Sequence, residues 1–280
     1  MSNGETLLRK AEKALQSGGL FNFTPKEQRL ENAAEAFNDA ANAFKMDRDL
    51  AKAGQTYERE AAVRTEIKQH IDAANALNEA FKCYRQTAPV EAARVLEASV
   101  AAFREGKNAR RAAAQFETLA KLYEELGETE RARTAYQQAG TFYRDENQEA
   151  TANKSLLKYA ELSAIAKEYY DAIAVFEDVA KSNIANNLLR FSVKDHLFKA
   201  GVCHLATNDI IGAGQAFQRY AEIDKTFLTT REYALLQELK EAIEVPAEGQ
   251  RIRQSEPLRL LEGNNDWKNR RHPPGIGRGL

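Results

Sequence analysis

The stretch that decides the fold runs from Thr151 to Lys199 and reads TANKSLLKYAELSAIAKEYYDAIAVFEDVAKSNIANNLLRFSVKDHLFK. It opens with the pattern AxxxLxxYA, and looser versions of this pattern occur in the segments that precede it. Apolar residues three and four positions apart form one face of an α-helix. The stretch therefore predicts tandem amphipathic helices that pack against one another.

Alanine recurs about every twenty residues before this stretch and into it. The alanines concerned are Ala33, Ala53, Ala73, Ala93, Ala113, Ala132, Ala152 and Ala172. Twenty residues accommodate one helix and a turn, so two intervals make a hairpin of roughly forty residues, as in helical solenoids. Small alanines allow helices to approach closely while neighbouring aromatic side chains fill the gaps. The spacing predicts an all-α solenoid that resembles tetratricopeptide repeats but has longer helices.

Individual segments give approximate boundaries. The 3,4 spacing predicts helices over 31–45, 72–85 and 91–105. A break is expected at 87–89, because Pro89 disfavours helix at the preceding residue. Further breaks are expected at 106–108 and 126–128, where glycine would supply a left-handed stop. We expect a solenoid over residues 1–180, a C-terminal helical bundle over 181–244 and a poorly ordered basic tail over 245–280. Within the bundle, helices are predicted over 192–205, 211–223 and 230–243, with turns at 208–209 and 224–229.

Composition argues against several classes of function. The formal net charge of −1 gives no field that would attract nucleic acid, although residues 245–280 are basic and the rest of the chain is acidic. Cys83 and Cys203 lie far apart in a chain with no signal peptide, which indicates free thiols in a reducing compartment. No apolar run approaches the ~20 residues of a membrane span. We expect a cytoplasmic protein.

Motifs for catalysis, metals and cofactors are absent from the sequence. None of the four histidines lies three or four residues from another histidine or a cysteine, the spacing that helical metal sites prefer. The glycines are scattered as turn residues and form no phosphate-binding loop. We therefore expect a protein that is not an enzyme and that holds no metal or cofactor.

An apolar loop near the start of the chain allows two interpretations. Residues 18–25 place Leu20, Phe21 and Phe23 between glycines and a proline. Either a phenylalanine packs under the first helices as a staple, or the loop contacts a membrane. Three such side chains give only weak, reversible attachment, because each insertion contributes roughly 1.5–3 kcal/mol at best.

Lysines provide the other candidate surface. Lys154 and Lys158 are spaced i, i+4, so both ammonium groups leave one face of a predicted helix. Lys194 begins another helix about forty residues later, and a helical hairpin between them would bring the chain back alongside itself. Such a surface would suit an elongated acidic partner. The alternative is that these lysines bind no partner and lie on an ordinary solvated helix face.

Two segments of this part of the sequence also resemble a known family. ANKSLLK at 152–158 and LLRFSVKDHLFKA at 188–200 resemble alpha-SNAP, the soluble NSF attachment proteins, in a fungal-like form, and the match extends from about Leu7 to Glu244. The resemblance implies a peripheral membrane adaptor that wraps the largely acidic four-helix SNARE bundle. It also implies recruitment of NSF, an AAA ATPase that disassembles the bundle in vesicle fusion and protein transport. The rival hypothesis is a generic scaffold that binds peptides of an unrelated complex.

Site residues follow from the resemblance one by one. It implies SNARE contacts for Lys154, Lys158 and Lys194 and a membrane contact for the 18–25 loop. Two further basic positions of the family fall on Asn108 and Ala114, and nearby Lys107, Arg110 and Arg111 are candidates to replace the lost charge. Contacts with NSF are implied, more weakly, for Asp209, Glu238, Glu241 and Glu244.

The final residues depart from the family pattern. Proteins like alpha-SNAP close with a helix and an acidic end that activates the ATPase, whereas residues 245–280 carry seven Arg or Lys against four Asp or Glu. Four prolines within them break any long helix. Either an altered reading frame or a divergent but competent end would produce such a tail. We expect a chain with this tail to hold a SNARE bundle but to stimulate the ATPase NSF poorly.

Overall fold

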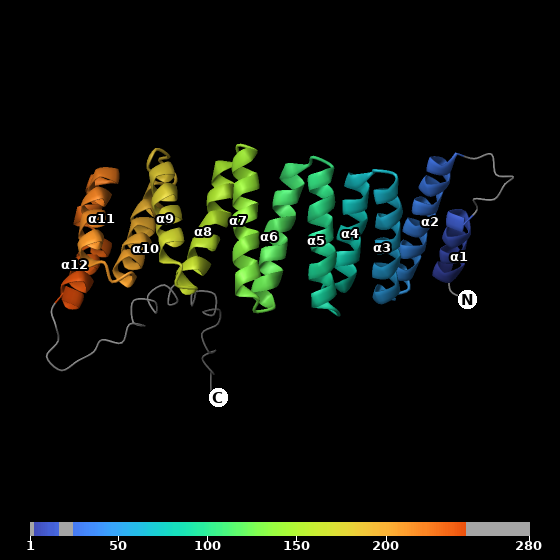
Figure 1. Ribbon diagram of the computed structural model, residues 1–280, viewed down its shortest axis with the longest axis horizontal. Helices are drawn as coiled ribbons and strands as arrows, with labels where there is room; N and C mark the ends of the chain where they lie inside the picture. Colours follow the sequence, from blue (N-terminus) through green and yellow to red (C-terminus); the bar gives the residue numbers. More distant parts are fainter. Residues whose placement is uncertain (1–2, 17–24, 245–280) are drawn as a thin grey trace, which may run out of the picture. The chain divides into compact units, whose positions relative to one another are not determined.

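The computed structural model describes residues 3–16 and 25–244, and within those ranges it contains helices and no strand (Figure 1). The all-α prediction is confirmed. The α-helices are α1 (Asn3–Gln16), α2 (Lys26–Met46), α3 (Leu50–Glu66), α4 (His70–Tyr84), α5 (Pro89–Glu105), α6 (Ala109–Glu125), α7 (Thr129–Asp145), α8 (Glu149–Ile165), α9 (Tyr169–Ile184), α10 (Val193–Ala206), α11 (Ile210–Ile223) and α12 (Arg231–Glu244), with 3-10 helices η1 (Arg190–Ser192) and η2 (Lys225–Thr229).

The chain forms two compact units, Met1–Leu156 and Leu157–Leu280, whose boundary falls inside α8. In the first unit each helix packs beside the next one along the chain, as antiparallel hairpins (Figure 1). The predicted division into a solenoid up to residue 180 and a bundle from 181 stays a prediction. The expected basic tail, 245–280, lies outside the described residues.

Small and large side chains alternate in the core as the spacing predicted. Each of the eight periodic alanines is at most 4 % exposed, and Phe37 and Leu96, which follow two of them, are fully buried. A glycine beside one of these alanines also serves close packing. A Cβ atom on Gly54 would lie 2.5 Å from the ring of Tyr84, so a side chain at this contact between α3 and α4 would displace Tyr84. The twenty-residue spacing is thus a packing repeat.

One turn design joins most of the hairpins. In the α5–α6 turn, Lys107 has a positive φ of 53°, and the amide of Asn108 donates to the carbonyl of Phe103 at 2.9 Å. This is the Schellman arrangement, which satisfies carbonyl groups at a helix end. Asn108 then caps α6, because its side chain accepts from the amide of Arg111. The left-handed residues of the helix connections are Arg48, Lys68, Lys107, Gly127, Asn147, Lys167 and Asn208.

Glycine occupies the left-handed position at one of the two turns where it was expected. Gly127 has a φ of 75°, as predicted, but Gly106 has a φ of −74° and Lys107 beside it adopts the left-handed conformation instead. The prediction for Gly106 was wrong because the packing of the hairpin fixes the residue at which the helix stops. A Cβ on Gly106 would meet Ile71 at 2.9 Å, so this glycine serves close packing.

The α4–α5 connection is built differently. Pro89 begins α5, and Ala88 before it is extended, with φ −144° and ψ 70°. Proline disfavours the helical conformation at the preceding residue, so the predicted break at 87–89 is confirmed with its expected cause.

The second unit has its own core. Side chains from α9 to α12 bury Phe176, Leu197, Phe217, Phe227 and Leu236 among their neighbours. The three helices predicted here agree with α10, α11 and α12 within about one residue at each end. The predicted turn at 224–229 is largely the 3-10 helix η2.

Both cysteines are free, as predicted, and both are buried. Burial raises the pKa of the Cys203 thiol to about 12 and also raises the pKa of Cys83. The thiolate is the reactive form, so these thiols are unreactive while the protein is folded.

Candidate partner-binding surfaces

The lysine pair lies on α8. Lys154 is exposed, and among the described residues it makes no ion pair. Lys158 is half-buried, and its ammonium lies 3.6 Å from Glu161 one turn later. The i, i+4 spacing places both on one face of the helix, as predicted. The α8 helix therefore offers one unpaired cation and one weakly paired cation side by side.

Glu161 connects α8 to α10. Its carboxylate accepts a hydrogen bond from Lys199 at 2.7 Å while it lies near Lys158. Lys199 also lies 5.8 Å from the ring centre of Phe176. Sequence reasoning missed Lys199, although it lies within the quoted word at 188–200, because only the structure shows that it meets α8.

Lys194 lies in the first turn of α10. Its ammonium donates to Glu232 of α12 at 2.7 Å, and this hydrogen bond raises its pKa. About half of the side chain stays exposed, so a partner would have to compete with Glu232. Exposed pairs of this kind contribute about 0–1 kcal/mol, which makes such competition easy.

The replacement cations sit where α6 begins. Lys107 is exposed in the α5–α6 turn, and Arg110 and Arg111 follow in the first helical turn. The guanidinium of Arg111 donates to the side-chain carbonyl of Asn75 on α4 at 3.2 Å. The three residues are close in sequence but differ in setting, because Arg111 is held by α4 and the other two make no ion pair among the described residues.

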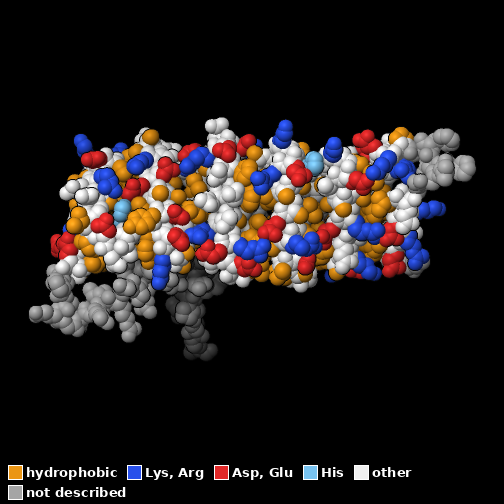
Figure 2. Space-filling model, in the orientation of Figure 1, with side chains coloured by type: hydrophobic (Ala, Val, Ile, Leu, Met, Phe, Trp, Pro, Cys, Tyr) orange, Lys and Arg blue, Asp and Glu red, His pale blue; other side chains and the backbone are white. Residues whose placement is uncertain are grey.

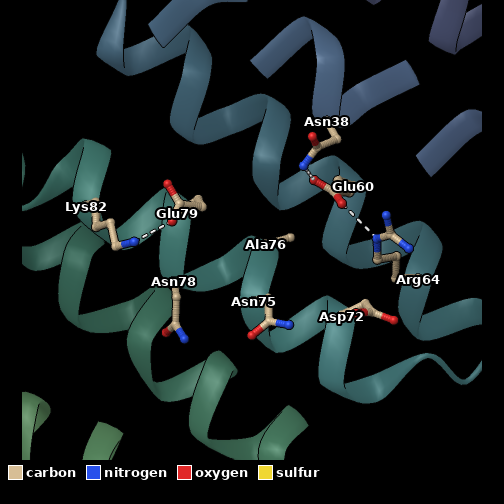
Figure 3. Close-up of a pocket in the computed structure, with 9 residues that line it drawn as sticks. All are labelled: Asn38, Glu60, Arg64, Asp72, Asn75, Ala76, Asn78, Glu79 and Lys82. Atoms are coloured by element: carbon tan, nitrogen blue, oxygen red, sulfur yellow. Dashed lines mark hydrogen bonds and ion pairs between the residues drawn. The ribbon is translucent and has the colours of Figure 1, made fainter. Parts of the chain in front are cut away.

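A polar pocket of about 420 Å³ lies beside Asn75, over α2, α3 and α4 (Figure 3). Glu60 is 2 % exposed and accepts from Asn38 at 2.9 Å and from Arg64 at 2.7 Å. Burial raises its pKa even though both donors favour the charged form. No motif marked this pocket in the sequence. The i, i+4 pair of Glu60 and Arg64 was visible there, but such pairs are common on solvated helices.

The acidic candidates lie on α11 and α12. Asp209 caps α11 by accepting from the amide of Gly212 at 2.9 Å. Glu238, Glu241 and Glu244 are exposed on α12 at spacings of three residues, and Glu244 pairs with Lys240 at 2.8 Å. The spacing gives α12 one acidic face, whereas Asp209 has a structural role of its own.

Some predicted features fall outside the described residues. Leu20, Phe21 and Phe23 belong to residues 17–24, so neither interpretation of the apolar loop is tested. Among the helices that the structure describes, none is long and apolar enough to span a membrane. The side chains that the structure describes also form no group of three or more His, Cys, Asp or Glu that could hold a metal ion.

Comparison with known proteins shows which proteins the chain as a whole is similar to. Residues 2–250 match the model of the soluble NSF attachment protein family, SNAP. A probable vesicular-fusion protein sec17 homolog of Neurospora crassa is 42% identical over 240 residues, 84% of this chain and 82% of that protein. The corresponding Schizosaccharomyces pombe protein is 40% identical over 87% of this chain and 85% of its own length. The human alpha-soluble NSF attachment protein is 32% identical over 85% and 81%.

Proposed function

The chain belongs to the soluble NSF attachment protein family, and from that premise we propose that it is an adaptor that binds assembled SNARE bundles at membranes and recruits NSF to disassemble them. The observation that carries the proposal is the lysine pair of α8, in which Lys154 is exposed and free of ion pairs among the described residues. The pair stands in ANKSLLK, one of the two segments that carry the resemblance to the family.

Lysine suits contact with an acidic bundle. A flexible ammonium finds carboxylates without the fixed geometry that a guanidinium requires, so one face can serve several related bundles. Each exposed contact contributes about 0–1 kcal/mol and is screened by salt. Affinity then comes from several contacts together, which we assign to Lys154, Lys158 and Lys194.

The membrane and ATPase contacts complete the proposal. Leu20, Phe21 and Phe23 of the 18–25 loop insert weakly into lipid and need the bundle as a second contact. The exposed glutamates of α12, Glu238 and Glu241, are candidates for docking NSF.

The test reverses the charge of the α8 pair. Lys154→Glu/Lys158→Glu should lose most of its retention on an immobilised SNARE bundle at low salt, and wild-type retention should itself fall as salt rises. Helix content should stay unchanged, because both side chains are at least partly exposed.

A matched control is Lys181→Glu, an exposed cation on α9 outside the proposed surface. Its retention should equal that of the wild type. If the double variant binds the bundle as the wild type does, these lysines are not the binding site.

A further inference from the structure

One edge of the first unit holds the end of α1, the start of α2 and the α3–α4 and α5–α6 turns. Glu5 and Glu12 of α1 pair in order with Lys52 and Arg59 of α3, at 3.3 and 2.7 Å, so the two helices run in the same direction. α1 therefore ends, and α2 begins, at the edge that holds the α3–α4 turn (Figure 1).

Contacts between side chains make this edge continuous. Lys26 at the start of α2 pairs with Glu66 at the end of α3 at 2.7 Å. His70 at the start of α4 lies 3.0 Å from Glu105 at the end of α5. We call residues 26–29, 66–71 and 104–111 the α2–α6 edge.

The α2–α6 edge is basic. It holds seven Lys or Arg against three Glu, whereas the connections at the opposite edge, 45–50, 85–91 and 124–131, hold four Lys or Arg against seven Asp or Glu. Beyond α6 the charge along this edge changes from positive to negative, because the acidic residues Asp145 and Glu146 lie at the α7–α8 turn. Basic side chains project from this edge over the α3–α4 and α5–α6 turns (Figure 2).

Several of its cations have no acidic partner. Lys68, Lys107 and Arg110 are exposed and make no ion pair with any residue that the structure describes. At the opposite edge, Arg85 and Arg131 are tied to glutamates at 2.7 and 3.0 Å. The positive charge of the α2–α6 edge is therefore available to a partner.

Backbone conformation fixes two of these cations at the tips of the turns. Lys68 and Lys107 have φ values of 60° and 53°, a conformation that glycine adopts at lower cost. Arg48 shares this conformation at the opposite edge, with a φ of 62°. The two edges therefore differ in net charge and not in the backbone conformation of their turns.

We propose that the α2–α6 edge lies against an anionic lipid surface, with Lys68 and Lys107 at the phospholipid headgroups. A row of turn tips matches a plane, whereas the proposed bundle contacts Lys154 and Lys158 lie on the face of a helix. Stable attachment to a membrane takes two signals, and a basic patch supplements a weak apolar anchor. The proposal rests on the adaptor function and assigns Lys107, Arg110 and Arg111 to lipid instead of to the SNARE bundle.

The test is flotation of the full chain with vesicles of phosphatidylcholine alone or mixed with phosphatidylserine. The variant is Lys68→Gly/Lys107→Gly, which removes both charges and suits the left-handed backbone, so lost binding does not reflect unfolding. Its partition onto phosphatidylserine vesicles should fall about fivefold for each lysine. Binding to neutral vesicles should not change.

The matched control is Arg48→Gly/Lys167→Gly, which removes two left-handed cations that do not belong to the edge. It should bind phosphatidylserine vesicles as the wild type does. The proposal is overturned if the Lys68/Lys107 variant keeps its preference for anionic vesicles. It is also overturned if that variant loses retention on a detergent-solubilised SNARE bundle, since the edge would then be a protein-binding site.

A further variant separates this inference from the adaptor function. Phe21→Ser/Phe23→Ser should weaken binding to both kinds of vesicle and keep the preference for anionic ones. If wild-type protein fails to bind the bundle at all while the edge variants behave as expected, the adaptor function fails and the lipid-binding edge stands.

Discussion

At the scale of single residues, His196 ties the stability of the second unit to pH. It is 8 % exposed on α10, and its Nε2 lies 3.4 Å from the side-chain nitrogen of Asn183. Burial lowers its pKa to about 4, with a further lowering by Lys199 and a small opposing effect of Glu161. The folded protein therefore holds this imidazole neutral at a pH where an exposed histidine would be half charged.

The sign of the resulting pH dependence follows from the two pKa values. The unfolded chain takes up a proton near pH 6.5, whereas the folded chain does so near pH 4, so stability is present above pH 6.5 and is lost as the pH falls toward 4. The loss is on the order of 3 kcal/mol. His196→Gln should flatten this part of the curve of unfolding free energy against pH, measured by urea denaturation.

The control for this prediction is His204→Gln. His204 lies 3.3 Å from Glu177 on α9, and hydrogen bonds from His204 and Tyr220 keep the pKa of Glu177 below its usual value despite burial. This variant should retain the acid-dependent loss between pH 6.5 and 4. An unchanged slope in His196→Gln would mean that another group takes up the proton.

At the scale of elements, the left-handed turns are positions where glycine should stabilise the fold. Lys167 joins α8 to α9 with a φ of 67° and makes no ion pair among the described residues. Lys167→Gly should raise the free energy of unfolding by up to about 1 kcal/mol, because the Cβ penalty of this conformation disappears. Chemical denaturation at neutral pH measures the change.

Two companion variants check the cause. Lys167→Ala removes the charge but keeps the Cβ, so it should change stability little. Gly127→Ala places a Cβ at a φ of 75° and should cost about 1 kcal/mol, although space is open around it. Stabilisation by Lys167→Ala equal to that by Lys167→Gly would assign the effect to charge.

The helices were largely predictable because packing repeats with the chain. The packing period, the fold class and most breaks between helices followed from the alanine spacing and from Pro89. The left-handed residue at Lys107 did not, because no local rule prefers lysine at a left-handed helix end. The lysine pair of α8 was predictable from its spacing. The α2–α6 edge was not, because its cations come from three segments that only the hairpins bring together.

At the scale of the whole molecule, binding and activation should separate. We expect the chain to hold a SNARE bundle but to stimulate ATP hydrolysis by NSF weakly, because the arginine-rich residues 245–280 carry the opposite charge from the family's acidic end. The measurement is ATP hydrolysis by NSF with bundle present, for the full chain and for a version truncated after Glu244. Strong stimulation that the truncation abolishes would show that these residues are competent.

The repeated turn also limits how such a chain changes length. Asn108 closes α5 through its amide and starts α6 through its side chain, so no spare residue lies between the two functions. One inserted or deleted residue near this turn would rotate the next helix by about 100° and turn its buried alanines toward solvent. Length variants within this solenoid should therefore be tolerated as whole hairpins of roughly forty residues and rejected in smaller steps.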